Sequence, residues 1–115
     1  MSERRAHMRV PFIVPVNLVH ERRALKGYWT HDLSEGGMRM EFLPVPIRSL
    51  VKVVVPLPAG ETDRHCIVEG EVMWRTFRST GVRFLDPPQD VLQYVRDVVD
   101  HGVPQKQDRE LQLTN

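Results

Sequence analysis

Short segments that alternate between apolar and polar residues, separated by turn-forming residues, most limit the folds open to this chain. The alternation places every second side chain on one face, which is typical of a half-buried β-strand. The expected strands are residues 10–18, 26–31, 38–42, 50–57, 66–74 and 80–85. Closing short strands into a barrel hides their edges. The sequence therefore predicts an all-β fold, a small six-stranded antiparallel β-barrel.

The spacing of the apolar residues changes near the C-terminal end. Val91 and Val95 belong to a series with helical spacing, which should lay an apolar stripe on the barrel. Asp86 is expected to cap the start of this helix, with Pro87 at its first position and Gly102 just past its end.

The length of 115 residues suits one domain with a single modest core. We expect a flexible basic arm at 1–9, the barrel and helix at 10–101, and a disordered polar tail at 102–115. The lone cysteine, Cys66, excludes an internal disulfide and is expected to be buried. No segment approaches the roughly 20 apolar residues of a membrane-spanning helix, and no signal peptide is recognisable. A cytoplasmic protein without membrane insertion is expected.

Positive charge is gathered in two places rather than spread over a face. The formal net charge is only +1, and basic residues cluster at Arg4, Arg5 and Arg9 and again at 22–26. A protein that binds long DNA or RNA is expected to need a wide basic face. The distribution therefore favours a compact anionic ligand over a nucleic acid polymer.

The sequence holds no recognisable catalytic or metal-binding pattern. None of the five histidines has a metal-ligand spacing or joins a C-x-x-C pair. His31 stands beside Asp32, but adjacent strand residues point to opposite faces, which does not suit a catalytic triad. We therefore expect a binding protein without a metal or other cofactor, not an enzyme.

Two short motifs combine into a candidate ligand site. The first is Arg5-Ala-His-Met-Arg9, and the second is Asp32-Leu-Ser-Glu-Gly-Gly37. Guanidinium groups bind phosphates and the O6/N7 edge of guanine. A carboxylate such as that of Asp32 accepts hydrogen bonds from the N–H groups on the other guanine edge. Together the motifs favour a site for a small, doubly charged guanine nucleotide.

Each motif alone also has a plain structural interpretation. The arginines can form a solvated basic arm. The second motif can be an Asx-type turn in which Asp32 and Ser34 bond to nearby backbone. In that turn, Gly36 and Gly37 would supply left-handed backbone.

In these motifs the chain resembles the PilZ domain family, whose members bind the second messenger cyclic di-GMP. The family pattern is R-x-x-x-R followed by D/N-x-S-x-x-G, and the resemblance extends from about Glu3 to His101. It implies that Arg5 and Arg9 grip the Hoogsteen edges and phosphates of the nucleotide. Asp32 and Ser34 would take the other guanine edge. The expected ligand-binding residues are Arg4, Arg5, Arg9, Asp32, Ser34, Gly36 and Gly37.

Three further residues have expected roles near this site. The resemblance associates the position of Arg4 with whether one nucleotide or a stacked pair is bound, and an arginine there resembles the pair-binding type. Trp74 is expected at the barrel core or rim, with a stacking platform for the nucleotide as the alternative. Arg75 could add a phosphate contact.

Three functions remain open from the sequence. The favoured one is a bacterial cyclic di-GMP receptor that signals through a changed surface to a separate downstream effector protein. The second is a PilZ-like adaptor that no longer binds nucleotide, against which the intact motifs argue. The third is a small nucleic-acid-binding barrel, whose affinity would fall steeply with salt.

Overall fold

The computed structural model describes residues 8–59 and 62–102, and it places side chains for these ranges except at 56–64. The strands are β1 (Val10–Pro11), β2 (Pro15–His20), β3 (Arg23–Ser34), β4 (Gly37–Glu41), β5 (Leu50–Ala59), β6 (Thr62–Arg75) and β7 (Ser79–Leu85). One helix, α1 (Gln89–His101), follows them in this part of the chain.

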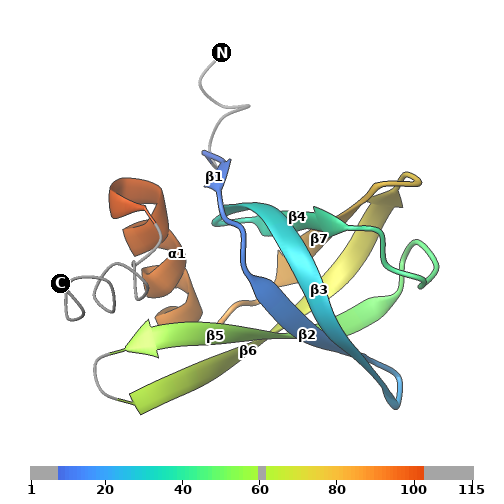
Figure 1. Cartoon of the computed structure of the whole chain (residues 1–115), viewed down its shortest axis with the longest axis horizontal. Coiled ribbons are helices and arrows are strands. Elements are labelled where there is room, and N and C mark those ends of the chain that lie inside the picture. Colours follow the sequence, from blue (N-terminus) through green and yellow to red (C-terminus); the bar gives the residue numbers. More distant parts are fainter. Residues whose placement is uncertain (1–7, 60–61, 103–115) are drawn as a thin grey trace, which may run out of the picture.

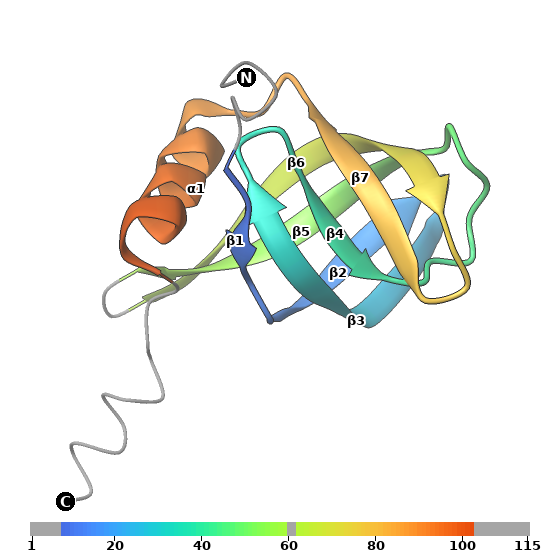
Figure 2. The ribbon, with the colours of Figure 1, turned by 90° about the horizontal axis from the view of Figure 1, so that it is seen from above.

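The six longer strands pair antiparallel in a closed ring. The order β2-β5-β6-β7-β4-β3 returns to β2, because β3 pairs with both β4 and β2 (Figure 1). The two residues of β1 pair with the end of β3. Figure 2 shows α1 beyond one end of the barrel, next to β1. The predicted six-stranded barrel with one C-terminal helix is therefore confirmed.

Alternating apolar side chains fill the barrel. Met38 and Met40 are fully buried while Arg39 between them is exposed, so β4 presents opposite faces to core and solvent. Buried valines of α1 close one end of this core; they are Val91, Val95 and Val98. The predicted burial of Cys66 is confirmed, and its thiol donates a hydrogen bond to a carboxylate of α1.

Phe12 joins the chain between β1 and β2 to the helix. Its ring is fully buried and meets Tyr94 of α1 edge-on, with 6.1 Å between ring centroids. Burial raises the pKa of Tyr94 to about 12. The backbone N–H of Phe12 donates to the carbonyl of His31, and its carbonyl accepts a hydrogen bond from Thr30. Phe12 thus links α1, β3 and the core.

The predicted start of the helix is wrong. Asp86 has left-handed backbone, with φ of 49°, and α1 begins at Gln89 with Pro88 as its N-cap and no side-chain cap. A residue that precedes proline is disfavoured in the helical region, so Pro87 cannot begin a helix before Pro88. The predicted end is right, because Gly102 has φ of 84° and donates its N–H to the carbonyl of Val98.

Candidate functional site

A tight hairpin joins β3 to β4 and carries the second motif. Ser34 pairs with Gly37 across the two-residue turn, and Asp32 pairs with Arg39 two positions further along. We expected Asp32 to lie in a connecting loop, but β3 extends through Ser34. This segment is polar in composition, like a loop, yet its backbone is paired in the ladder between β3 and β4.

A β-bulge turns Asp32 to the outside of the barrel. The register between β3 and β4 shifts between Thr30 and Asp32, so His31 is an extra residue in β3. Thr30 is fully buried, and strict alternation would place Asp32 inside as well. The extra residue instead aims the carboxylate at the outer wall, which is a common use of bulges next to functional sites.

The Asp32 carboxylate is shared by two arginines from different segments. Arg9 places Nη1 2.6 Å from Oδ1, and Arg39 places Nε 2.9 Å from Oδ2. The side chain of Asp32 is 15% exposed, whereas both arginines are about half exposed. The structure thus brings the last residue of the first motif onto the first residue of the second.

Sequence reasoning missed Arg39, although a signal for it was present. A two-residue turn between Ser34 and Gly37 fixes the hairpin register, and that register sets Asp32 opposite Arg39. Arg39 is the only basic side chain within β4. Recognising the tight turn would therefore have added this residue to the site.

Ser34 and Gly36 hold the turn in shape. The Ser34 hydroxyl is buried, accepts the Gly36 N–H at 3.2 Å and donates to the Gly37 carbonyl at 3.3 Å. The Gly36 carbonyl accepts the Phe84 N–H at 2.9 Å, which docks the turn on β7. The serine oxygen therefore lies inside the turn in this structure.

Gly37 is required by a close contact between strands. Neither Gly36 nor Gly37 has the left-handed backbone that we expected. A Cβ atom at Gly37 would instead lie 2.1 Å from the carbonyl oxygen of Val82 in β7. Because glycine has no side chain, β4 and β7 can pack closely at this position.

Replacing Gly37 with alanine should destabilise the barrel, because the new methyl group meets backbone that cannot move aside. We expect a loss of about 1–3 kcal/mol in the free energy of unfolding, measured by urea denaturation. Gly81→Ala is the matched comparison, since its Cβ would meet the movable side chain of Trp74 rather than backbone. An equal loss in both variants would contradict this account of Gly37.

Trp74 lies in the same transverse row of the outer wall as Asp32. Trp74 pairs with Gly81, Gly81 with Arg39, and Arg39 with Asp32, so one row crosses β6, β7, β4 and β3. The indole covers Gly81, where a Cβ would lie 2.3 Å from it, and Trp74 is 41% exposed. A bulge between Val72 and Trp74 turns the tryptophan outward. Trp74 thus lies on the outer wall rather than in the core, in the row that contains Asp32.

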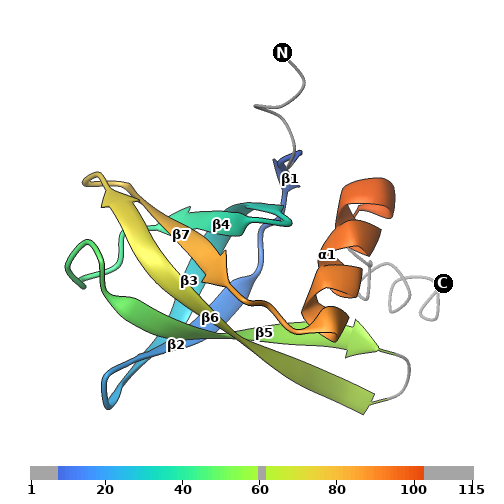
Figure 3. The ribbon, with the colours of Figure 1, turned by 180° about the vertical axis from the view of Figure 1, so that it is seen from behind.

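Arg75 makes its contacts just after β4, at the end of that strand that lies away from the turn. Its guanidinium lies 5.0 Å from the ring centroid of Phe42 and donates to the carbonyls of Leu43 and Val45. These contacts hold the loop that follows β4. Figure 3 shows that loop beyond the barrel end that faces away from α1.

Three other ion pairs involve Glu71 and Glu35. Arg83, which pairs with Gly37 across β4 and β7, binds Glu71 at 2.9 Å. Hydrogen bonds from Arg83 and, as the smaller contribution, from Arg48 hold the pKa of Glu71 below its ordinary value. In the turn, Glu35 lies 3.5 Å from Arg96 of α1. Arg4 and Arg5, which were also predicted to bind ligand, lie outside the described residues.

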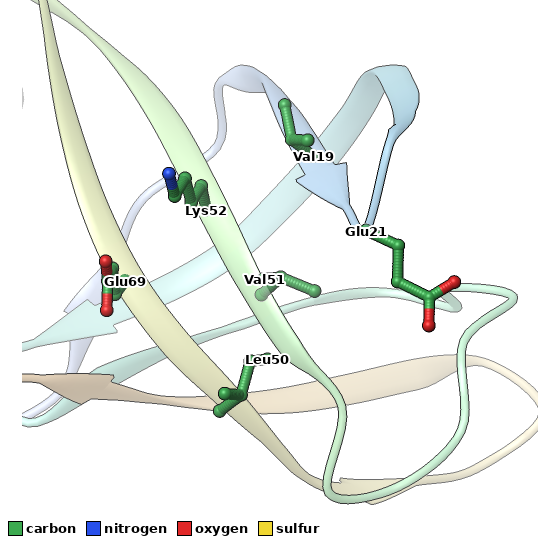
Figure 4. A pocket seen from close by; sticks show the side chains of 6 residues that line it. All are labelled: Val19, Glu21, Leu50, Val51, Lys52 and Glu69. Carbon is green, nitrogen blue, oxygen red and sulfur yellow. The ribbon is translucent and has the colours of Figure 1, made fainter.

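A depression on another part of the wall does not suit the expected ligand. It has a volume of about 210 Å³ and is lined by Val19, Glu21, Leu50, Val51, Lys52 and Glu69 from β2, β5, β6 and the turn after β2 (Figure 4). Two carboxylates and one ammonium give it a net negative charge, which disfavours a nucleotide. None of the predicted site residues that the structure describes lines it.

Within residues 8–59 and 62–102, no helix has the length and apolar character to cross a bilayer. The same residues contain no group of three or more side chains that could hold a metal ion.

Comparisons with known proteins agree with this architecture. The family model of the PilZ domain matches residues 3–101, so the chain belongs to the PilZ domain family, a family of cyclic di-GMP receptor domains. No curated protein matches the chain in sequence.

The solved structures that share the fold include three of low sequence identity to this chain. The PilZ domain of CeSA from a cellulose-synthesizing bacterium is 16% identical, with a TM-score of 0.63 over 80% of this chain and 94% of that one. The Bacillus subtilis inhibitor of motility MotI/DgrA is 14% identical, with a TM-score of 0.67 over 84% and 52%. Escherichia coli YcgR, solved in complex with c-di-GMP, is 17% identical, with a TM-score of 0.59 over 96% and 49%. The chain thus matches about half the length of the last two proteins.

Proposed function

We propose that this protein is a receptor for cyclic di-GMP that binds the nucleotide on the outer wall beside Asp32. The observation that carries the proposal is the contact between the two motifs, in which Arg9 lies 2.6 Å from Asp32. Family membership supports the same ligand. The site recognises and positions a nucleotide, and the proposal includes no catalytic step.

The proposed contacts follow from the hydrogen-bonding groups of guanine. The Asp32 carboxylate accepts from the N1–H and N2 amine groups, because an ionised carboxylate can only accept. Arg9, together with Arg5, binds phosphate oxygens and the O6/N7 edge as a bidentate donor. Arg4 adds a further donor. The half-exposed indole of Trp74 offers a stacking surface in the same row of the wall.

Ligand binding requires Arg9 to change partners. Arg9 donates to Oδ1 of Asp32 in this structure, and the proposed contacts use that same guanidinium on the nucleotide. The arginine then moves from the carboxylate to the nucleotide, while Ser34 and Gly36 keep the turn fixed. The arm and the bound nucleotide together form a new surface, which a separate effector protein reads.

Isothermal titration with cyclic di-GMP tests the proposal directly. We expect binding at micromolar protein concentration, and about a tenfold or greater loss of affinity in Arg5→Ala and in Arg9→Ala, because each removes charge-assisted hydrogen bonds. Arg23→Ala, in an exposed residue at the far end of β3, is the matched control and should bind normally.

Two results would contradict the proposal. Absence of binding to the wild-type protein would leave an adaptor that acts by protein contact alone. Binding to an oligonucleotide with steep salt dependence, undisturbed by added cyclic di-GMP, would indicate a nucleic-acid-binding barrel.

A further inference from the structure

We propose that Arg39, which lies outside both motifs, is a positioning residue that gives the site its preference for guanine. This role depends on the binding of cyclic di-GMP proposed above. Arg39 acts through Asp32: it fixes the plane of the carboxylate so that both oxygens face the N1–H and N2 amine groups of one guanine.

The two arginines on Asp32 are held in different ways. Arg39 lies within β4, which is paired on one side with β3 and on the other with β7. Arg9 precedes β1 and ends the first motif, whose arginines are expected to bind the nucleotide. The ligand therefore displaces Arg9 from Oδ1, whereas Arg39 has a fixed backbone from which to keep its bond to Oδ2.

A carboxylate can accept from Arg39 and from guanine at the same time. Each carboxylate oxygen has about two lone-pair sites. The Nε of Arg39 reaches Oδ2 at 2.9 Å from the neighbouring strand. Arg39 thus occupies one lone-pair site on Oδ2. The remaining lone-pair sites on both oxygens are available to a guanine base.

The surroundings of Arg39 leave it committed to this carboxylate. Its partner on the other side is Gly81, which has no side chain, and the Trp74 indole that covers Gly81 has no carboxylate to compete for the guanidinium. Among the described residues, Asp32 is its only carboxylate partner. Without this bond, the carboxylate would turn about its broad terminal torsion and lose its alignment with the guanine edge.

The test compares cyclic di-GMP with cyclic di-AMP, because adenine lacks the N1–H and N2 amine donors. In Arg39→Ala, we expect about a tenfold weaker affinity for cyclic di-GMP and little change for cyclic di-AMP, so the selectivity ratio falls about tenfold. Arg39→Lys keeps the charge and should recover part of the ratio. Both affinities are measured by titration, and unchanged melting temperatures show that the variants fold.

Arg48→Ala is the matched control. Arg48 is also an exposed arginine in an ion pair, 3.3 Å from Glu71, but it lies outside the row of Asp32. Its replacement should change neither affinity nor selectivity. Equal weakening of both nucleotides in Arg39→Ala would overturn the proposal, because it would show only a general effect of charge. Unchanged affinities would also overturn it, while failure of the wild-type protein to bind cyclic di-GMP would refute the proposed function itself.

Discussion

Replacing Asp32 with alanine is expected to weaken the binding of cyclic di-GMP by about 100-fold. The carboxylate would accept two hydrogen bonds from guanine, each worth at least about 1.5 kcal/mol because the acceptor is charged. Their combined loss, about 3 kcal/mol, corresponds to two decades in the dissociation constant. Isothermal titration measures the change.

The same substitution should leave the fold nearly unchanged. Both partners of Asp32 are about half exposed, and ion pairs of that kind contribute about 1 kcal/mol or less to stability. Asp97→Ala, which removes an exposed carboxylate from α1, is the matched control and should bind normally. If Asp32→Ala binds cyclic di-GMP with wild-type affinity, the nucleotide does not contact the Asp32 carboxylate.

Replacing Phe12 with alanine is expected to give the largest loss of stability, about 3–5 kcal/mol in the free energy of unfolding. The ring is fully buried and contacts Tyr94, so its removal leaves a cavity between the barrel and α1. Urea denaturation at constant pH measures the loss, and the melting temperature should fall by roughly 4–8 °C for each kcal/mol.

The neighbouring residue provides the control for this prediction. Ile13 is 69% exposed, and Ile13→Ala should change the free energy of unfolding by no more than about 0.5 kcal/mol. Similar losses in the two variants would mean that Phe12 does not anchor the helix to the core. If Phe12→Ala does not fold, Phe12→Leu should show a smaller loss of the same origin.

The barrel could be predicted because its inward side chains follow a regular period. Met38 and Met40 alternate with polar residues, and the observed β4 buries both. The bulges could not be predicted in this way, because no particular residue type marks the position of an extra strand residue such as His31. Strict alternation from Thr30 would have turned Asp32 into the core, which is why a polar segment of β3 resembled a loop.

The site was predicted in part. The motifs indicated that Arg9 and Asp32 belong together, and the structure places them in contact. Arg39 was missed because its relation to Asp32 depends on hairpin register rather than on sequence spacing. The helix start was misplaced because Asp86 has the composition of a cap, while the two prolines that follow it delay the first helical turn.

The β5–β6 ribbon extends beyond the barrel, and the composition of β5 affects how it meets other chains. Beyond Val54, β5 has no further pairs with β2, so among the described residues that margin of the strand has no strand partner. Pro56 and Pro58 occupy this stretch and supply no amide hydrogen. A strand of another chain that lay alongside this margin would meet the carbonyl acceptors of these prolines but no amide donors from them. The margin therefore resists strand addition and fibre growth.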